Sequence, residues 1–263
     1  MKEGVPRRRF LVLGGASALA LLASSCDTVE RVTAALGDGI TPDDADGRIS
    51  ARPQRVTDDA PTGRRALGLA EHRDAILYVP RAYTARRAWP LVVGLHGAGG
   101  RAKGGMRLFR RFADELGILV LAPPSRDASW DVRYGGFGPD VAFIDDALRF
   151  VFSRYRVDPR HVMLAGFSDG ASYALSLGLV NGDVFTHLCA FSPGFVSDGQ
   201  RHGRPDVFIA HGVDDPVLPI DRTSRRIVPE LRRDGYDVTY VEFDGDHHVE
   251  PENQERAVRW FLA

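Results

Sequence analysis

The sequence predicts an α/β fold, in which helices cover both faces of a mostly parallel β-sheet. Short, continuous runs of apolar and β-branched residues recur along the chain, and such runs suit strands that are buried on both faces. Stretches with apolar residues at helical spacing separate these runs. Strands that alternate with helices favour a doubly wound sheet, whose functional residues lie at the carboxyl ends of the strands.

Each expected element follows from its local pattern. We expect strands at Ile76–Val79, Leu91–Leu95, Ile118–Ala122, Val162–Ala165, Leu188–Phe191, Val207–Ala210 and Val238–Phe243. We expect helices at Leu108–Leu116, Asp140–Tyr155, Ala171–Val180, Ile220–Arg233 and Glu252–Leu262. Gly117 and Gly235 follow two of these helices closely, and glycine is common just past a helix end. The elements fit one domain of about two hundred residues, 66–263.

The composition narrows the class of partner. The chain has 263 residues, of which 44% are hydrophobic and 26% are charged, so it can bury an ample core. Its 34 lysine and arginine residues nearly balance 35 aspartate and glutamate residues, and the formal net charge is −1. This balance indicates neither a nucleic-acid partner nor a strongly acidic substrate. We expect Arg107, Arg110 and Arg111 to lie on a solvated helix face, and the oligomeric state stays open.

The segment Gly166–Gly170 has the pattern Gly-x-Ser-x-Gly between an apolar run and a stretch of small residues. A serine held in a sharp strand-to-helix turn needs glycine two residues before and two residues after it, because a Cβ there would collide with the adjoining backbone and helix. The pattern therefore predicts that Ser168 presents its hydroxyl above the sheet edge as a nucleophile.

Partners for this serine follow it in the chain order serine, acid, histidine. Asp215 comes just after an expected strand, and His247 lies in the turn after the last expected strand. Asp214 and His248 are the adjacent alternatives. We choose His247 as the base, because a serine hydroxyl is a poor nucleophile until a neutral imidazole accepts its proton. Asp215 would hold that imidazole in the tautomer whose free nitrogen faces the serine.

Two other histidines close strands before a glycine, His96 and His211. Both lie on the wrong side of the acid in chain order, so we expect them to stabilise loops. The segment His96–Gly100 would also bring a backbone N–H, that of Ala98, close to the oxyanion. We assign the second oxyanion donor to the N–H of Asp169, whose side chain needs no catalytic role at a helix N-terminus.

Several segments together resemble bacterial carboxylesterases of the α/β-hydrolase superfamily. The chain is similar to the phospholipase/carboxylesterase family and to the esterase relatives of polyhydroxybutyrate depolymerases and feruloyl esterases. The segments are His96–Gly100, Gly166–Gly170, Ser192–Gly194, His211–Pro219 and Gly245–Glu252. The resemblance implies an α/β-hydrolase fold over roughly residues 66–263 and places the acid just before Pro216, which favours Asp215. Asp246 departs from the family pattern, because many members have a second glycine there.

The resemblance implies a serine carboxylesterase that forms an acyl-enzyme on Ser168 and needs no cofactor. Alternatives of the same class are a lysophospholipase, a thioesterase and a polymer-directed esterase acting on polyhydroxyalkanoate or feruloyl esters, so the expected partner is a small-molecule or polymer ester. An alternative of another class is a non-catalytic binding protein of the cell envelope on the same scaffold. The acidic segment 244–250 lacks the spacing of metal ligands, and we expect no metal there.

Two segments bear on the substrate. The connection Ser192–Pro205 is too short to hold a lid domain, so we expect an open site. The long loop Pro123–Pro139 contains Trp130 and would form the rim that contacts the acyl or aryl group of the substrate. An aromatic loop that merely packs on the domain is the alternative.

The N-terminal residues 1–26 predict export. Basic residues at positions 7–9 precede the apolar stretch Phe10–Ala23, which is shorter than the roughly twenty residues of a membrane-spanning helix. The arginine run resembles a twin-arginine signal, and the destination would be the periplasm, the cell envelope or the exterior. Cys26 resembles a lipoprotein processing site, although leucine is usual where Ala23 stands. Lipid anchoring to the membrane through Cys26 and simple cleavage with release are both open.

Residues 27–65 are polar and lack apolar periodicity, which predicts a flexible linker. The remaining cysteine, Cys189, lies in an apolar run and is expected to be a buried core thiol.

Overall fold

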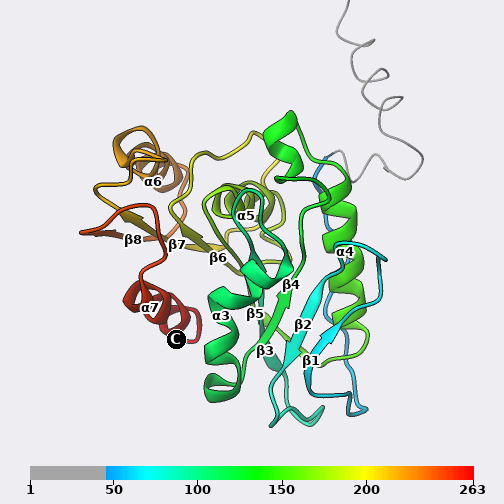
Figure 1. Ribbon diagram of the computed structural model, residues 1–263. Helices are drawn as coiled ribbons and strands as arrows, with labels where there is room; N and C mark the ends of the chain where they lie inside the picture. Colours follow the sequence, from blue (N-terminus) through cyan, green and yellow to red (C-terminus); the bar gives the residue numbers. More distant parts are fainter. Residues whose placement is uncertain (1–45) are drawn as a thin grey trace, which may run out of the picture. The chain divides into compact units, whose positions relative to one another are not determined.

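The computed structural model describes residues 46–263, and Figure 1 shows a β-sheet with helices on both sides. The sheet has eight strands in the order β1-β2-β4-β3-β5-β6-β7-β8. The strands are β1 (Gly63–Ala66), β2 (Ile76–Val79), β3 (Trp89–Leu95), β4 (Leu119–Ala122), β5 (Val157–Phe167), β6 (His187–Phe191), β7 (Asp206–Gly212) and β8 (Val238–Phe243). Strand β2 runs antiparallel to β1 and β4, and the other neighbouring pairs are parallel.

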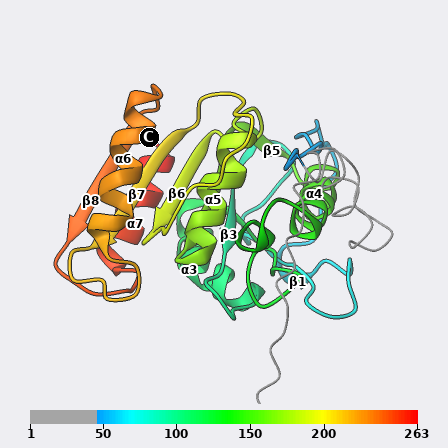
Figure 2. The same ribbon diagram turned by 90° about the horizontal axis from the view of Figure 1, so that it is seen from above.

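Helices cover both faces of this sheet, as the view from above shows (Figure 2). The described α-helices are α3 (Ala102–Leu116), α4 (Pro139–Phe152), α5 (Asp169–Val180), α6 (Ser224–Arg233) and α7 (Pro251–Phe261). Short 3-10 helices occur at η1 (Asp131–Tyr134) and η2 (Ile220–Arg222). Side chains of α4, α5 and α6 share one buried cluster, and those of α3 and α7 share the other. The predicted α/β class, a mostly parallel sheet flanked by helices, is confirmed.

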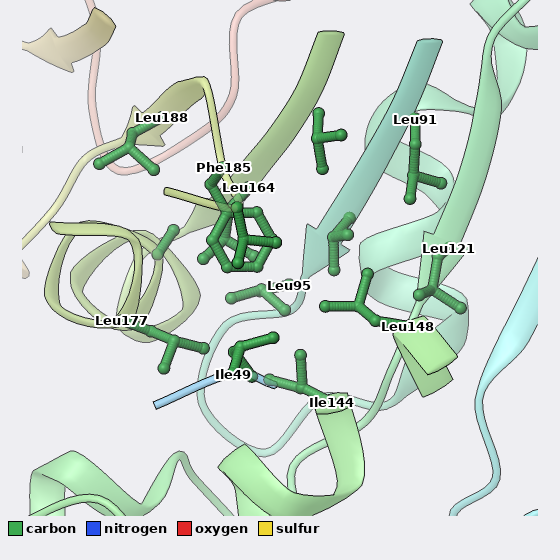
Figure 3. Close-up of a cluster of buried hydrophobic side chains, with 14 of the residues drawn as sticks. Ile49, Leu91, Leu95, Leu121, Ile144, Leu148, Leu164, Leu177, Phe185 and Leu188 are labelled. Atoms are coloured by element: carbon green, nitrogen blue, oxygen red, sulfur yellow. The ribbon is translucent and has the colours of Figure 1, made fainter. Parts of the chain in front are cut away.

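The larger cluster joins the middle of the sheet to α4 and α5. Leu91 of β3 and Leu164 of β5 lie with Ile144 and Leu148 of α4 and with Leu177 of α5 (Figure 3). Each such side chain contributes about 1.5–3 kcal/mol when it is fully buried. All residues of α5 are buried, so the helix that begins at the predicted elbow is enclosed on every side.

The smaller cluster covers the opposite face. Phe109 and Phe112 of α3 belong to it together with Val258 and Phe261 of α7. The helix α7 directly follows the loop that carries His247, so its packing on the sheet holds one end of that loop in place.

Strand order creates a switch point at the centre of the sheet. From β3 the chain crosses to β4 on one side, and it then returns to β5 on the other side of β3. The carboxyl ends of neighbouring parallel strands on either side of such a reversal leave a crevice, where α/β proteins bind ligands. Ser168 follows β5 and His96 follows β3, so both lie at this crevice.

Most predicted elements occur, but α3 begins six residues and β5 five residues before the expected helix and strand. The predicted helix Ile220–Arg233 is wrong at its start, where η2 and α6 are separated at Thr223. The strands predicted at Ile76–Val79 and Val238–Phe243 match β2 and β8 residue for residue. The sequence gives no signal for β1, because this edge strand reads Gly-Arg-Arg-Ala and is only partly buried. An edge strand with charged side chains has no apolar run to reveal it.

The predicted linker 27–65 is wrong at both ends of its described part, because residues 47–51 pack on the domain and residues 63–65 belong to β1. The side chains of Ile49 and Ala51 are buried, with 1% and 5% of their surface exposed. The N–H groups of Ser50 and Ala51 donate to Oδ1 of Asp145 across 3.0 and 2.7 Å, and the N–H of Ile49 donates to Oδ1 of Asn181 across 2.8 Å. Buried side-chain acceptors thus replace a regular ladder, which is why no periodicity appears in the sequence.

The predicted export signal 1–26, the processing site at Cys26 and the first part of the linker lie outside the described residues. Among residues 46–263, no helix has both the length and the apolar character that crossing a membrane requires. Cys189 on β6 is fully buried, as predicted, and burial raises the pKa of its thiol.

Candidate active site

Ser168 occupies a strained turn between β5 and α5. Its φ is 57° and its ψ is −120°, a conformation that non-glycine residues rarely adopt. The turn is fixed on both sides. The Ser168 N–H donates to the carbonyl oxygen of Phe191 across 2.9 Å, and the Ser168 carbonyl oxygen accepts the N–H groups of Ala171 and Ser172. The surrounding backbone thereby holds the serine in a conformation that would otherwise relax.

The two glycines of this elbow are required by close backbone contacts. A Cβ on Gly166 would lie 2.2 Å from the carbonyl oxygen of Gly170. A Cβ on Gly170 would lie 2.4 Å from the carbonyl oxygen of His96. Both separations are far below contact distance, so the reason that the sequence suggests for the glycines is confirmed.

A continuous chain of hydrogen bonds joins Asp215, His247 and Ser168. Nε2 of His247 lies 2.9 Å from Oγ of Ser168. Nδ1 of the same ring lies 2.6 Å from Oδ2 of Asp215. With Nδ1 protonated toward the carboxylate, Nε2 is free to accept the serine proton. This is the arrangement that nucleophile activation requires.

The Asp215 carboxylate is buried but well supplied with donors. Its Oδ1 accepts the N–H groups of Val217 and Leu218 across 2.9 and 2.8 Å. Burial opposes ionisation, but the hydrogen bonds from Leu218, His247 and Val217 outweigh it and hold the pKa of Asp215 below its usual value. The acid is therefore ionised at neutral pH.

The adjacent alternatives lie apart from this chain. Asp214 is exposed, and its backbone N–H donates to the carbonyl oxygen of Gly245 across 3.0 Å. Nδ1 of His248 lies 2.6 Å from Oδ1 of Asp246, and 46% of the His248 side chain is exposed. The structure thus brings Ser168 together with Asp215 and His247. Asp246, the departure from the family pattern, pairs with His248 instead.

Backbone N–H groups that can donate hydrogen bonds to an oxyanion lie next to Ser168. The Cβ position of Gly97 is 3.5 Å from the Cβ of Ser168, so the loop after β3 reaches the nucleophile. Within residues 46–263, neither the Ala98 N–H nor the Asp169 N–H donates to a protein acceptor. Asp169 opens α5, where the free N–H groups and the helix dipole favour negative charge.

The sequence of the chain is similar to those of named esterases. No family model matches the chain. It is 29% identical over 178 residues to a protein of Aspergillus oryzae named probable feruloyl esterase C, an alignment that covers 64% of either chain. It is 27% identical over 169 residues to feruloyl esterase C of Emericella nidulans, covering 61% of this chain and 62% of that one. The chain thus spans less than two thirds of the length of these relatives.

A solved structure decides the fold. The crystal structure of esterase PE8 superposes with a TM-score of 0.59 at 22% identity, covering 71% of this chain and 96% of that chain. The chain has an α/β-hydrolase fold. The resemblance that the sequence predicts is therefore confirmed, and the proteins with which the chain shares it are named esterases.

The loop 123–139 supports the loop after β3 through three hydrogen bonds. Nε2 of His96 accepts the N–H of Ser125 across 3.0 Å, and the Trp130 indole donates its N–H to the His96 carbonyl oxygen across 2.9 Å. The Gly99 N–H donates to the carbonyl oxygen of Ala128 across 2.7 Å. His96 thus stabilises loops, in agreement with the role expected for it.

Trp130 does not contact substrate space, so its predicted role in substrate binding is wrong. Only 1% of its surface is exposed, and its ring stacks on Tyr173 with centroids 4.9 Å apart. The indole anchors the loop because its large apolar ring is buried while its N–H finds a buried acceptor. The alternative weighed for this loop, aromatic packing on the domain, describes Trp130. Tyr134 in the same loop is 63% exposed.

The Asp169 side chain has a structural partner that the sequence did not reveal. Its Oδ1 accepts a hydrogen bond from Nη1 of Arg133 across 2.8 Å, and its Oδ2 accepts the hydroxyl of Ser129. The residue after the nucleophile therefore ties the loop 123–139 to the N-terminus of α5. Such contacts between distant segments have no local sequence signal.

A cleft of about 470 Å³ lies beside the oxyanion loop and His247. Its lining includes Ala98, Arg107, Leu108, Phe167 and Val249. Arg107, expected on a solvated helix face, is exposed but borders this cleft, where it is the only lysine or arginine. Within the described part of the chain, no three potential metal-ligating side chains gather at one point.

Proposed function

We propose that the protein is a serine carboxylesterase that forms an acyl-enzyme on Ser168. The observation that carries this proposal is the hydrogen-bond chain from Asp215 through His247 to Ser168, in which His247 also lines a cleft. Relatives and structural neighbours that are named esterases support it. A non-catalytic envelope protein would have no need of a strained serine with a complete set of partners.

The residues have distinct roles in the proposed reaction. Oγ of Ser168 attacks the acyl carbon while its proton passes to Nε2 of His247, and the carbonyl oxygen becomes an oxyanion. The N–H groups of Ala98 and Asp169 stabilise that charge. The imidazolium then donates its proton to the leaving alcohol, and the ester bond to the alcohol breaks. Asp215 stabilises the imidazolium throughout.

The second half of the reaction repeats these roles with water. His247 takes a proton from water, and the resulting hydroxide attacks the acyl carbon of the acyl-enzyme. The same two N–H groups stabilise the second oxyanion. When the intermediate collapses, Ser168 recovers its proton from His247 and the carboxylic acid is released.

An ester with an aromatic acyl group is the second candidate for the substrate, and two observations favour it. The relatives are named feruloyl esterases, and the cleft has apolar side chains from Leu108, Phe167 and Val249 that suit an aryl ring. Faster hydrolysis of methyl ferulate than of methyl butyrate would support a feruloyl esterase. Preference for methyl butyrate would leave the general carboxylesterase. A lysophospholipase or thioesterase would instead prefer long acyl chains or thioesters.

Hydrolysis of p-nitrophenyl acetate, butyrate and octanoate by the full-length protein tests the proposal. We expect hydrolysis by the wild type and a loss of about 10³-fold or more in Ser168→Ala, because removal of the nucleophile leaves only the oxyanion hole and binding. Equal hydrolysis by the two proteins, both shown to be folded by circular dichroism, would exclude Ser168 as the nucleophile.

We further propose that residues 1–26 direct export and that residues 46–263 form the catalytic domain. Mass spectrometry of protein isolated from the producing cell discriminates the two fates of Cys26. A mature N-terminus at Cys26 that carries acyl chains identifies lipid anchoring. A mature chain that begins elsewhere and carries no lipid identifies cleavage and release.

A further inference from the structure

A second histidine contacts the acid of the proposed triad. His211 is the sixth residue of β7, and its side chain is completely buried. Its Nε2 lies 3.1 Å from Oδ2 of Asp215, the same oxygen that lies 2.6 Å from Nδ1 of His247. One carboxylate oxygen therefore faces two imidazole rings. The reaction as proposed uses only one of them.

The partners of His211 fix where its proton lies. Nε2 also lies 2.9 Å from the carbonyl oxygen of Leu218, so both of its neighbours are acceptors and this nitrogen must carry the hydrogen. Nδ1 lies 2.7 Å from Oγ of Ser224, whose hydroxyl can donate to it. Burial lowers the pKa of His211. The ring is accordingly neutral, with one N–H shared between Asp215 and Leu218.

Charges around His211 are already paired. Its partner in register on β8 is Glu242, whose Oε2 lies 2.6 Å from Nη2 of Arg225 on α6. On its own loop it faces Asp215, and across that carboxylate lies His247. With Glu242 neutralised by Arg225, Asp215 is the charge that the His211 N–H meets directly.

We propose that His211 is a positioning residue, which holds Oδ2 of Asp215 toward His247 and limits how strongly the carboxylate favours protonated His247. This inference rests on the proposed esterase function. Two backbone N–H groups on Oδ1 and two imidazole N–H groups on Oδ2 distribute the negative charge and fix the carboxylate plane. Without the His211 donor, Oδ2 carries more charge and Asp215 is the stronger base.

That change has a defined sign in a pH profile. A more basic Asp215 stabilises the His247 imidazolium more strongly, so His247 keeps its proton to a higher pH. Since the base acts only when it is neutral, the acid limb of kcat/KM moves to higher pH. A residue that served only to support the fold would lower stability or the amount of active enzyme without moving this limb.

The experiment compares the wild type with three variants on p-nitrophenyl butyrate. His211→Met removes the N–H but keeps much of the volume, and His211→Gln keeps an amide donor of similar reach. Ser224→Ala is the matched control, because it removes the other partner of the ring and leaves Nε2 facing the same two acceptors. Circular dichroism and the melting temperature report on folding.

We expect the acid limb of His211→Met to lie about half a pH unit or more above that of the wild type. In His211→Gln the acid limb should lie close to that of the wild type. In Ser224→Ala it should lie at the wild-type pH, even if the melting temperature falls. An unmoved limb in folded His211→Met, or an equal shift in Ser224→Ala, would overturn the inference. If His211→Met does not fold, His211→Asn takes its place, since the shorter amide cannot reach Oδ2. A wild type without esterase activity would refute the proposed function instead.

Discussion

The indole N–H of Trp130 donates to the carbonyl oxygen of His96 across 2.9 Å, which connects the centre of one loop to the start of another. The His96 loop carries the Ala98 N–H, so Trp130 supports the proposed oxyanion site, while its own ring is buried and does not line the cleft. The long loop 123–139 therefore has a structural role, which is to hold the loop after β3 in place.

Trp130→Phe should reduce both stability and turnover while leaving the order of preference among acetate, butyrate and octanoate esters unchanged. The buried carbonyl oxygen of His96 loses its partner, which costs about 1–3 kcal/mol of unfolding free energy. Urea unfolding and kcat/KM on the three esters measure the two effects. Tyr134→Phe, at the exposed residue of the same loop, is the control. A changed chain-length preference in Trp130→Phe would return this side chain to the substrate site.

Asp215→Asn should lower kcat by about 10⁴-fold, because an amide can hold the imidazole in the wrong tautomer and cannot stabilise the imidazolium. Asp214→Asn, one residue away and exposed, should stay within a few-fold of the wild type. Initial rates on p-nitrophenyl butyrate provide the comparison. Equal losses in the two variants would mean that the carboxylate of Asp215 has no special role.

Gly170→Ala should destabilise the fold by about 1–3 kcal/mol or prevent folding, since overpacking at a rigid backbone contact has this cost. The added Cβ would lie 2.4 Å from the His96 carbonyl oxygen. Gly136→Ala is the matched control, because nothing lies within 4 Å of its Cβ position. The melting temperatures of the two variants are compared, and equal values would show that the contact at Gly170 does not limit stability.

The partly buried Asp131 and the buried Asp140 should make stability depend on pH. Each accepts the backbone N–H of the other, across 2.8 and 2.9 Å. Burial, followed by the charge of Asp140, raises the pKa of Asp131 to about 7. Because this lies above the unfolded value of about 3.9, its stabilising contribution is complete below that value and is lost as the pH rises through about 7.

In Asp131→Asn, the unfolding free energy should therefore fall less than in the wild type between about pH 5 and about pH 8. Urea unfolding at both pH values measures the difference. Asp198→Asn, an exposed site, should keep the wild-type dependence. An unchanged dependence in Asp131→Asn would show that this carboxyl does not carry the effect.

Arg107 should favour esters that bear an anionic group. In the wild type, the ratio of kcat/KM for p-nitrophenyl hemisuccinate to that for p-nitrophenyl butyrate should exceed the ratio in Arg107→Gln by up to about five-fold, the size expected of an exposed ion pair. Lys103→Gln on the same helix, outside the cleft lining, controls for the general loss of positive charge. Equal ratios in wild type and Arg107→Gln would remove this side chain from substrate selection.

The fold and the nucleophile elbow could be predicted because their signals are local. Buried parallel strands such as β2 and β8 need continuous apolar runs, and the turn at Ser168 needs glycine at Gly166 and Gly170 for steric reasons. Chain order then indicates the two segments that carry the acid and the histidine, and it leaves Asp214 and His248 as alternatives to Asp215 and His247. These features depend on residues close in sequence or on a fixed topology.

Other features depend on contacts between distant segments and left no such signal. The packing of residues 49–51 depends on acceptors at Asp145 and Asn181 far along the chain. The direction of the Trp130 ring depends on a carbonyl oxygen of another loop. For His211, the spacing of four residues to Asp215 around a strand end is a usable signal, although only the fold shows that the ring turns toward the carboxylate.

The most direct test of the central claim is intact-protein mass spectrometry after reaction with a fluorophosphonate, followed by peptide mapping. The wild type should gain one phosphonyl group, located on Ser168, and Ser168→Ala should gain none. A folded wild type that stays unmodified, or a modification on any other residue, would contradict the proposal that His247 activates Ser168 as the nucleophile.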